Sequence, residues 1–209
     1  MKTGRRLRRV AGLGCGGGQN VNGTFLPTHK TGALLQIICG EAALHQVIFR
    51  FYGNFAQDAH IALFLSDPEN IGKHASRLAN WVIEKMGGDG RPWTEERSLR
   101  ATCPMVQRLG DGSDFFVHDR SSAYHAAWFS IKRSAALQGQ RFKLKDARVW
   151  MCLMFWSCRE EGLLHSPAYA DWYVGFIAHV IFVYERSAPP FAFEAAEWSH
   201  DAARTAAYE

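Results

Sequence analysis

The chain has 209 residues, of which 47% are hydrophobic, and this length suits one well-packed domain with at most an appended arm. The formal net charge is +4, but residues 1–30 carry six basic side chains and no acidic one, which leaves −2 for the rest. This distribution argues against a nucleic-acid partner, because such a domain carries its basic patch on the folded surface beside aromatic side chains. The longest dense apolar stretch, residues 172–184, is shorter than the roughly 20 residues that cross a bilayer, so we expect no membrane partner.

Residues 1–38 form a basic, glycine-rich segment without hydrophobic periodicity, and we expect this arm to be disordered. Its arginine content also fits an organellar targeting signal, which is the alternative to a solvated tail. The chain has five cysteines and no Cys-x-x-Cys pair, a pattern that argues against a zinc cluster or a disulfide framework. A reducing, cytoplasmic location fits these thiols best.

A first helix is expected to begin near Gly40, in the stretch "GEAALHQVIFRFYGNFAQ". Apolar side chains recur there at the spacing of one buried helical face, and they are Leu44, Ile48, Phe51, Tyr52 and Phe55.

A second helix is expected in "GKHASRLANWVIEKMGG", residues 72–88. Asp67 can cap it, Pro68 suits its first position, and the glycines at 87 and 88 favour a left-handed end. Its apolar stripe at helical spacing consists of Ile71, His74, Leu78 and Trp81. Because His74 shares the face that must be buried, we expect its imidazole to point inward.

The segment 89–118 predicts a β-hairpin, because "PMVQRL" and "FFVH" flank the turn-forming sequence "GDGSD". Ser121 or Ser122 then caps a short helix, "AYHAAWFSIKR", and a polar, basic connector follows it.

Two more helices complete the expected fold. One begins near Asp146 and is apolar almost all round from Val149 to Trp156, so it should lie at the centre of the core. The other starts at the Ser-Pro pair 166–167 and stops before the Pro-Pro pair 189–190. About five helices and one hairpin make the fold class all-α.

Two stretches, "GEAALHQVIFRFYGNFAQD" and "KHASRLANWVIEKMGG", resemble the first half of truncated haemoglobins, the short globins with a two-over-two helical sandwich. The family's Arg-Phe-Tyr sequence is present, whereas Cys39 replaces a glycine of its opening motif and Trp81-Val82 replaces its Phe-Leu pair. The later stretch "ARVWMCLM" is similar to the family's tryptophan segment. The resemblance implies a globin-like domain at 39–188 with an insertion at about 89–120, followed by a C-terminal tail at 189–209.

The resemblance also implies a haem b cofactor. Tyr52 corresponds to the distal tyrosine that hydrogen-bonds an iron-bound ligand, and His74 to the distal histidine. Trp150 corresponds to the tryptophan that lies along the haem, and Phe64 or Leu65 to the ring-packing corner residue. Phe51, Leu78 and Trp128 complete the set of residues that we expect to contact the cofactor.

The proximal iron ligand is expected to be His125. The family shows a histidine followed three residues later by phenylalanine, and here Trp128 follows His125 at that spacing. His118 is the rival ligand, but it ends a predicted strand and precedes Asp119-Arg120, a pair typical of a surface turn. Haem requires only one neutral imidazole on iron, with an apolar pocket around it.

The expected function is binding of dioxygen, nitric oxide or carbon monoxide at haem iron. Three donors, from Tyr52, His74 and Trp150, would hold a bound oxygen tightly, since each charge-assisted hydrogen bond contributes about 1.5–3 kcal/mol. Slow release suits sensing, or nitric-oxide or peroxide chemistry with an unidentified reductase, better than bulk oxygen transport. The sequence leaves open whether the protein is an enzyme.

Two alternatives stay open. In one, the chain is a haem-free globin-like interaction or regulatory domain, and His74 and His125 are core histidines with hydrogen-bonded nitrogens. In the other, it is a haem enzyme with two axial histidines, in which His74 closes on the iron when no ligand is bound.

Overall fold

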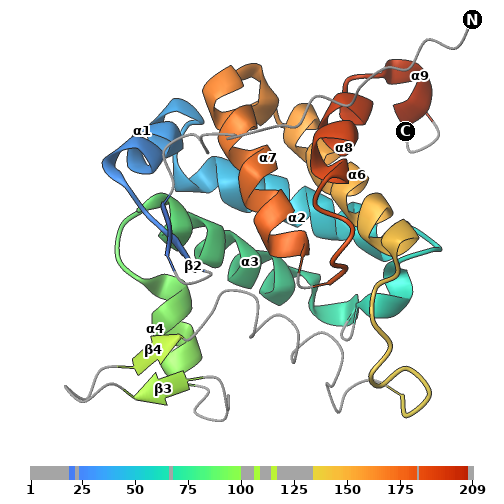
Figure 1. The fold of residues 1–209 in the computed structure, drawn as a ribbon, viewed down its shortest axis with the longest axis horizontal. Helices are drawn as coiled ribbons and strands as arrows, with labels where there is room; N and C mark the ends of the chain where they lie inside the picture. Colours follow the sequence, from blue (N-terminus) through green and yellow to red (C-terminus); the bar gives the residue numbers. More distant parts are fainter. Residues whose placement is uncertain are drawn as a thin grey trace, which may run out of the picture.

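The computed structural model describes residues 19–21, 24–65, 68–99, 106–108, 114–116, 134–182 and 184–206. This part of the chain is mostly helical (Figure 1). The four long helices among these residues are α2 (Glu41–Gln57), α3 (Ile71–Met86), α6 (Leu144–Glu160) and α7 (Pro167–Ile181). Shorter helices are α1 (His29–Ile37), α4 (Pro92–Leu99), α8 (Phe191–Ser199) and α9 (Ala202–Thr205), with 3-10 turns at Ala62–Phe64, Pro68–Asn70 and Leu163–His165. The all-α expectation is confirmed at this level.

Two short antiparallel hairpins accompany the helices. Strands β1 (Gln19–Val21) and β2 (Thr24–Leu26) pair before α1. Strands β3 (Val106–Arg108) and β4 (Asp114–Phe116) pair with Val106 opposite Phe116, which confirms the hairpin predicted within 89–118. Helix α4 precedes this second hairpin and was not expected.

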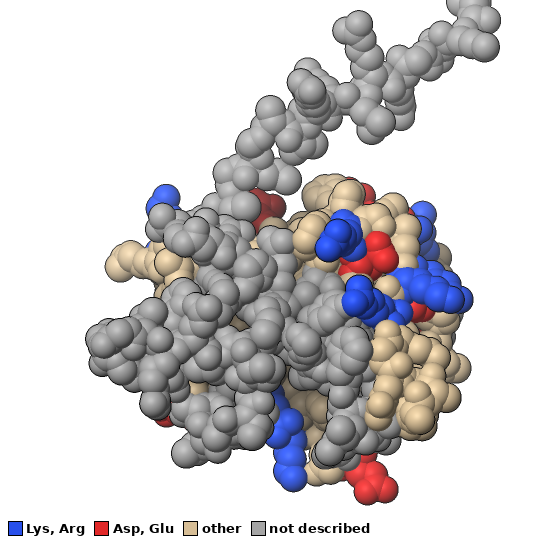
Figure 2. Space-filling model, turned by 60° about the horizontal axis from the view of Figure 1, so that its bottom comes forward, with Lys and Arg blue, Asp and Glu red and all other residues tan. Residues whose placement is uncertain are grey.

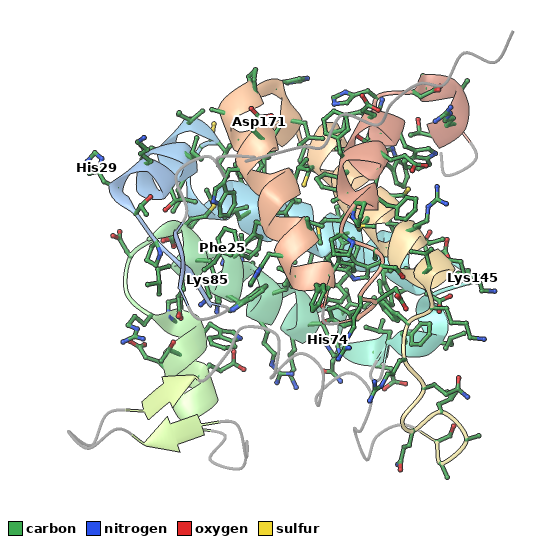
Figure 3. All side chains as sticks on the ribbon, viewed as in Figure 1. Phe25, His29, His74, Lys85, Lys145 and Asp171 are labelled. Atoms are coloured by element: carbon green, nitrogen blue, oxygen red, sulfur yellow. The ribbon has the colours of Figure 1, made fainter. Side chains whose placement is uncertain are left out.

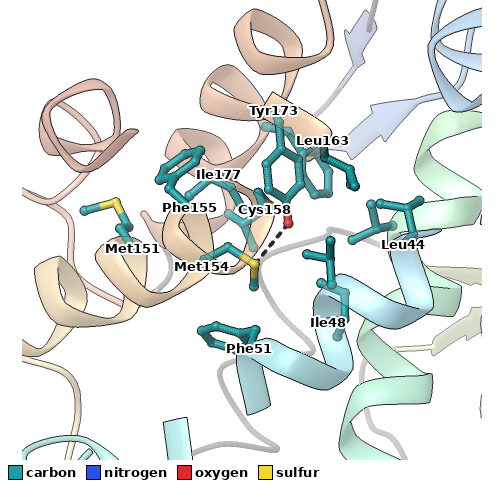
Figure 4. Packing of buried hydrophobic residues seen from close by; sticks show 14 of the residues in the cluster. Leu44, Ile48, Phe51, Met151, Met154, Phe155, Cys158, Leu163, Tyr173 and Ile177 are labelled. Carbon is teal, nitrogen blue, oxygen red and sulfur yellow. Dashed lines mark hydrogen bonds between the residues drawn. The ribbon is translucent and has the colours of Figure 1, made fainter. Parts of the chain in front are cut away.

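The long helices surround one hydrophobic core. Helix α2 packs on both α3 and α6, α8 lies along α6, and α7 crosses in front of α2 in the view of Figure 1. Aromatic contacts join α7 to its neighbours: the ring of Phe176 lies 5.3 Å from Trp81 of α3, and Tyr173 lies 6.0 Å from Phe155 of α6. Figure 4 shows this packing, with the Tyr173 hydroxyl donating to the Met154 sulfur at 3.2 Å.

The predicted helix ends are close to the observed ones. Helix α2 begins at Glu41, next to the expected Gly40, and α3 ends before Gly87, whose φ of +85° is left-handed. Pro68 starts a 3-10 turn and α3 itself begins at Ile71, while Asp67 lies outside the described residues.

The two later helices also follow local signals. In α6 the Lys143 backbone N–H donates to Asp146 at 2.7 Å, so the helix begins at Leu144, slightly earlier than expected. Most side chains from Trp150 to Trp156 are buried, as predicted for a central helix. The Ser166 hydroxyl accepts from the Tyr169 N–H at 3.3 Å and caps α7. Helix α7 ends at Ile181, well before the predicted stop.

The disorder expected up to residue 38 is wrong for residues 24–38, where β2 and α1 form. Thr28 and Thr31 cap each other reciprocally at the start of α1, and Leu34 and Leu35 are buried. The segment 189–206, expected as a tail, contains α8 and α9, and α8 buries Ala192 and Ala195. The predicted short helix at 123–133 lies outside the described residues.

Among the described residues no single helix has the length and apolar composition of a membrane span. Helices α1 and α2, which meet at a bend of 73°, reach those values only when they are taken together. Figure 2 shows basic and acidic side chains interspersed on the described part of the face turned forward.

Candidate ligand-binding site

Tyr52 of α2 and His74 of α3 lie side by side, with ring centroids 5.7 Å apart and planes at 33°. The close packing of α2 on α3 brings them together. Both are partly buried. Figure 3 shows His74 towards one end of α3 and Lys85 towards the other. A phenol and an imidazole therefore present two hydrogen-bonding groups at one position.

The predicted buried stripe of α3 agrees with the observed one only at Trp81. The buried side chains of this helix are Ala75, Ala79, Trp81, Val82, Ile83 and Met86. Ile71, His74 and Leu78 lie on the flank of this face and are half-buried. His74 is thus turned towards Tyr52 at the margin of the core, so the expectation that its imidazole points inward is met only in part.

Aromatic rings continue from Tyr52 to Trp150. Phe51, which is fully buried, lies edge-on to Tyr52 at 5.2 Å and edge-on to Trp150 at 5.1 Å. The structure therefore brings together four of the predicted site residues, which are Phe51, Tyr52, His74 and Trp150.

Beyond Trp150 the rings continue through two residues that the sequence analysis missed. Tyr184 stacks on Trp150 at 6.5 Å and on Phe142 at 5.1 Å. The ring of Phe142 is in turn edge-on to Phe64 at 4.4 Å. We call the rings of Phe51, Trp150, Tyr184, Phe142 and Phe64 the aromatic wall. A lone aromatic residue in the basic connector "QRFKLK" was the available signal for Phe142.

The two corner candidates differ in environment. Phe64 is half-buried and takes part in the aromatic wall, whereas Leu65 is buried in the core. Because only Phe64 presents an aromatic ring, it suits the predicted ring-packing corner position better than Leu65 does.

Burial keeps both phenols of the site protonated. It raises the pKa of Tyr52 far above its ordinary value, with a further increase from Tyr184 and an opposing effect of the Arg77 guanidinium. Burial also raises the pKa of Tyr184 to about 12. Both hydroxyls therefore remain neutral donors at physiological pH.

The Arg77 guanidinium supplies a positive charge that acts on the Tyr52 phenol. Arg77 follows His74 by one turn of α3, and its Nε donates to Glu96 of α4 at 3.0 Å. Helix α4 is fixed to α3 by Thr94, whose backbone N–H and hydroxyl donate to the Glu84 carboxylate at 2.7 and 2.8 Å.

The predicted iron ligands His125 and His118, together with Trp128, lie outside the described residues. Among the residues that the structure describes, no group of three or more His, Cys, Asp or Glu side chains could hold a metal ion. Tyr52 and His74 instead provide two hydrogen-bonding groups next to Phe51, the first ring of the aromatic wall.

Comparisons of the chain with family models, with curated proteins and with solved structures give no match. The functional argument therefore depends on the residues of this chain.

Proposed function

We propose that the protein is a haem-binding globin of the truncated type that binds dioxygen, nitric oxide or carbon monoxide. The observation that carries the proposal is the pair of Tyr52 and His74, 5.7 Å apart, beside the aromatic wall. The packing of α2 on α3, with α6 and α7 completing the core, is compatible with a two-over-two helical sandwich.

Within this proposal, each described residue has a defined task. Haem b would supply an iron centre that takes up a diatomic ligand. The Tyr52 hydroxyl and the His74 imidazole would donate hydrogen bonds to that ligand. Phe51 would hold the Tyr52 ring in place through an edge-on contact, and Trp150 would support Phe51 in the same way.

His125 would bind the iron on the side opposite His74, and His118 is the rival for this role. Both assignments are drawn from the sequence. The apolar surroundings of the cofactor would be completed by Leu78, Phe64 and Trp128. Of these, Leu78 and Phe64 are half-buried.

Tight binding is expected from two donors. A charge-assisted hydrogen bond contributes about 1.5–3 kcal/mol, which corresponds to roughly a 10- to 150-fold change in an equilibrium constant. Slow ligand release favours sensing, or nitric-oxide or peroxide chemistry with a reductase partner, over bulk transport.

Absorption spectroscopy tests the proposal directly. The protein, expressed with added haem precursor and purified, should show a Soret band. His125→Ala should abolish the band, and His118→Ala should leave it intact. His29→Ala is the matched control, because His29 is an exposed histidine on the distant helix α1.

Other spectra would count against the proposal in defined ways. A colourless wild type after haem supplementation would refute it and favour the haem-free interaction domain. Loss of the band in His118→Ala alone would move the iron ligand to His118. A low-spin spectrum without added ligand would show His74 as a second axial ligand.

A further inference from the structure

Aliphatic side chains are exposed where β2 ends and along the outer face of α1. Leu26, the last residue of β2, is 40% exposed, and Ile37, the last residue of α1, is 57% exposed. Pro27, which follows Leu26, and Ala33, one helical turn before Ile37, are exposed as well. We call Leu26, Pro27, Ala33 and Ile37 the aliphatic edge. Helix α1 lies at the periphery of the fold, and Figure 3 shows His29 of this helix pointing away from it.

A groove of about 580 Å³ adjoins the aliphatic edge. Pro27 and Ala33 line it with apolar side chains, and Gly32 and Gly87 contribute only backbone to its walls. None of the described residues that line the groove is acidic, so no negative charge within it repels an anionic partner.

The basic charge of the chain joins the fold next to Leu26. Gln19 and Leu26 are Cα partners in the hairpin of β1 and β2, so residues 1–18 meet the fold beside the exposed leucine. This stretch holds a basic cluster, which consists of Lys2, Arg5, Arg6, Arg8 and Arg9. The first acidic residue of the chain is Glu41. Because the chain from Arg9 to Gln19 can extend over at most about 35 Å, the basic cluster stays within reach of any surface that the aliphatic edge touches.

We propose that the aliphatic edge is a contact surface for membranes that contain anionic phospholipids, and that the basic cluster supplies the attraction to them. Basic side chains bind the charged lipid headgroups, and aliphatic side chains enter the boundary between headgroups and acyl chains. A single-stranded nucleic acid would instead require aromatic side chains on which its bases could stack, and the aliphatic edge has none.

This contact differs from a membrane span. The absence of a membrane partner expected from the sequence was based on the lack of a spanning segment, and contact with a membrane surface needs no such segment. The inference is independent of the proposed function, because neither Tyr52 nor His74 belongs to the aliphatic edge.

Two weak contributions act together in such a contact. Each Lys or Arg close to an anionic surface strengthens binding by roughly fivefold, and salt reduces this effect. The aliphatic side chains add the transfer of their exposed surface from water. Stable association with a membrane usually requires two signals of this kind, so the loss of either one should be measurable.

Cosedimentation of the full chain with lipid vesicles tests this inference. The wild type should bind vesicles made of equal parts of phosphatidylcholine and phosphatidylserine, should bind pure phosphatidylcholine weakly, and should dissociate as salt is added. Replacement of the four arginines of the basic cluster by glutamine should weaken binding by roughly several hundredfold. Ile37→Ser should weaken it about four- to fifteenfold and Leu26→Ser about three- to sevenfold, in proportion to the exposed surface of each side chain.

Matched controls remove similar groups from other parts of the surface. Phe193, which is 61% exposed, lies on α8, and Figure 1 shows α8 on the opposite side of the molecule from α1. Phe193→Ser should therefore leave vesicle binding unchanged. Arg148→Gln and Arg204→Gln remove exposed charges of α6 and α9 and should also have little effect. Circular dichroism of each variant checks that the fold is retained.

Several results would overturn the membrane contact surface. One is equal binding of the wild type to vesicles with and without phosphatidylserine. Unchanged vesicle binding in both Ile37→Ser and Leu26→Ser would show that the aliphatic edge does not touch the lipid. A loss in Phe193→Ser as large as that in Ile37→Ser would place the contact elsewhere. Tighter binding to a single-stranded RNA than to the vesicles, unaffected by Ile37→Ser, would assign the basic cluster to a nucleic acid.

Discussion

Gly88 follows the end of α3 and lies against Glu41 at the start of α2, and we predict that replacing it with alanine destabilises the fold. An added Cβ would lie 2.5 Å from Glu41 Oε1 and 3.2 Å from Leu35 Cδ2, and it would also collide with Ile83 Cγ2. Real Cβ atoms essentially never approach heavy atoms closer than 3.0 Å, so these side chains must move. Glu41 cannot move freely, because its Oε1 accepts from the Asp89 N–H at 2.9 Å.

The size of the effect follows from three contributions. Overpacking costs about 1–3 kcal/mol, and loss of the Glu41 hydrogen bond costs about 0.5–1.5 kcal/mol. Alanine restricts the unfolded chain and returns about 0.4–1 kcal/mol. The expected net change for Gly88→Ala is a loss of about 0.5–4 kcal/mol in the free energy of unfolding.

Gly53→Ala is the matched control. Gly53 lies inside α2, and no heavy atom of the described residues lies within 4 Å of its added Cβ. The exchange should therefore stabilise the protein by about 0.5–1 kcal/mol, the difference in helix preference between the two residues.

Urea unfolding followed by circular dichroism at 222 nm gives both values, provided that the m-values of the variants agree. A Gly88→Ala protein as stable as the wild type would refute the packing argument. Equal changes of the same sign in both variants would refute it too, since the two sites differ in packing and not in chemistry.

Three further predictions concern the site and its surroundings. Tyr52→Phe and His74→Leu should each speed dioxygen release from the haem-loaded protein by roughly 10- to 150-fold, because each removes one hydrogen bond to the ligand. Stopped-flow absorbance measures the release rate. An unchanged rate would show that the substituted residue does not bond to the ligand. Phe142→Ala should lower the free energy of unfolding by about 3–5 kcal/mol, the usual cost of truncating a buried phenylalanine. A loss below about 1 kcal/mol would show that Phe142 does not pack between Phe64 and Tyr184 as described. The free energy of unfolding should fall as the pH rises from about 9 towards 12. Burial raises the pKa of Cys152 to about 11 and that of Tyr184 to about 12. Both groups lose their protons more easily in the unfolded chain, so alkaline pH favours unfolding. Cys152→Ala should flatten the lower part of this profile in urea titrations at successive pH values, and an unchanged slope there would contradict the assignment.

The sequence predicted α2 and α3 well because their signals are local. The apolar spacing of α2 and the glycine after α3 specify a buried face and an end without reference to the rest of the chain. Helix α1 was missed because it is short and follows a glycine-rich segment. A helix of this length depends on burial of Leu34 and Leu35 more than on helix preference.

The end of α7 shows the limit of periodicity. Its apolar run continues to Tyr184, which favoured a longer helix. The Tyr184 N–H instead bonds to the Ile181 carbonyl at 2.9 Å in a turn. This turn lets the Tyr184 ring stack on Phe142 and Trp150, a tertiary contact that no local pattern records.

The candidate site was predictable where both partners lie on neighbouring helices. Tyr52 and His74 meet because α2 and α3 pack closely, which the resemblance to truncated haemoglobins implied. Phe142 and Tyr184 were not predictable as site residues, since their roles depend on contacts between segments far apart in the chain.

Two segments that were expected as additions to the fold pack on elements next to the candidate site. The connector supplies Phe142, which packs between Phe64 and Tyr184, and the inserted segment supplies Glu96, which pairs with Arg77. Both segments therefore make tertiary contacts with the helices around the candidate site. Changes in Phe142 should act mainly on stability, because this side chain is buried among aromatic rings.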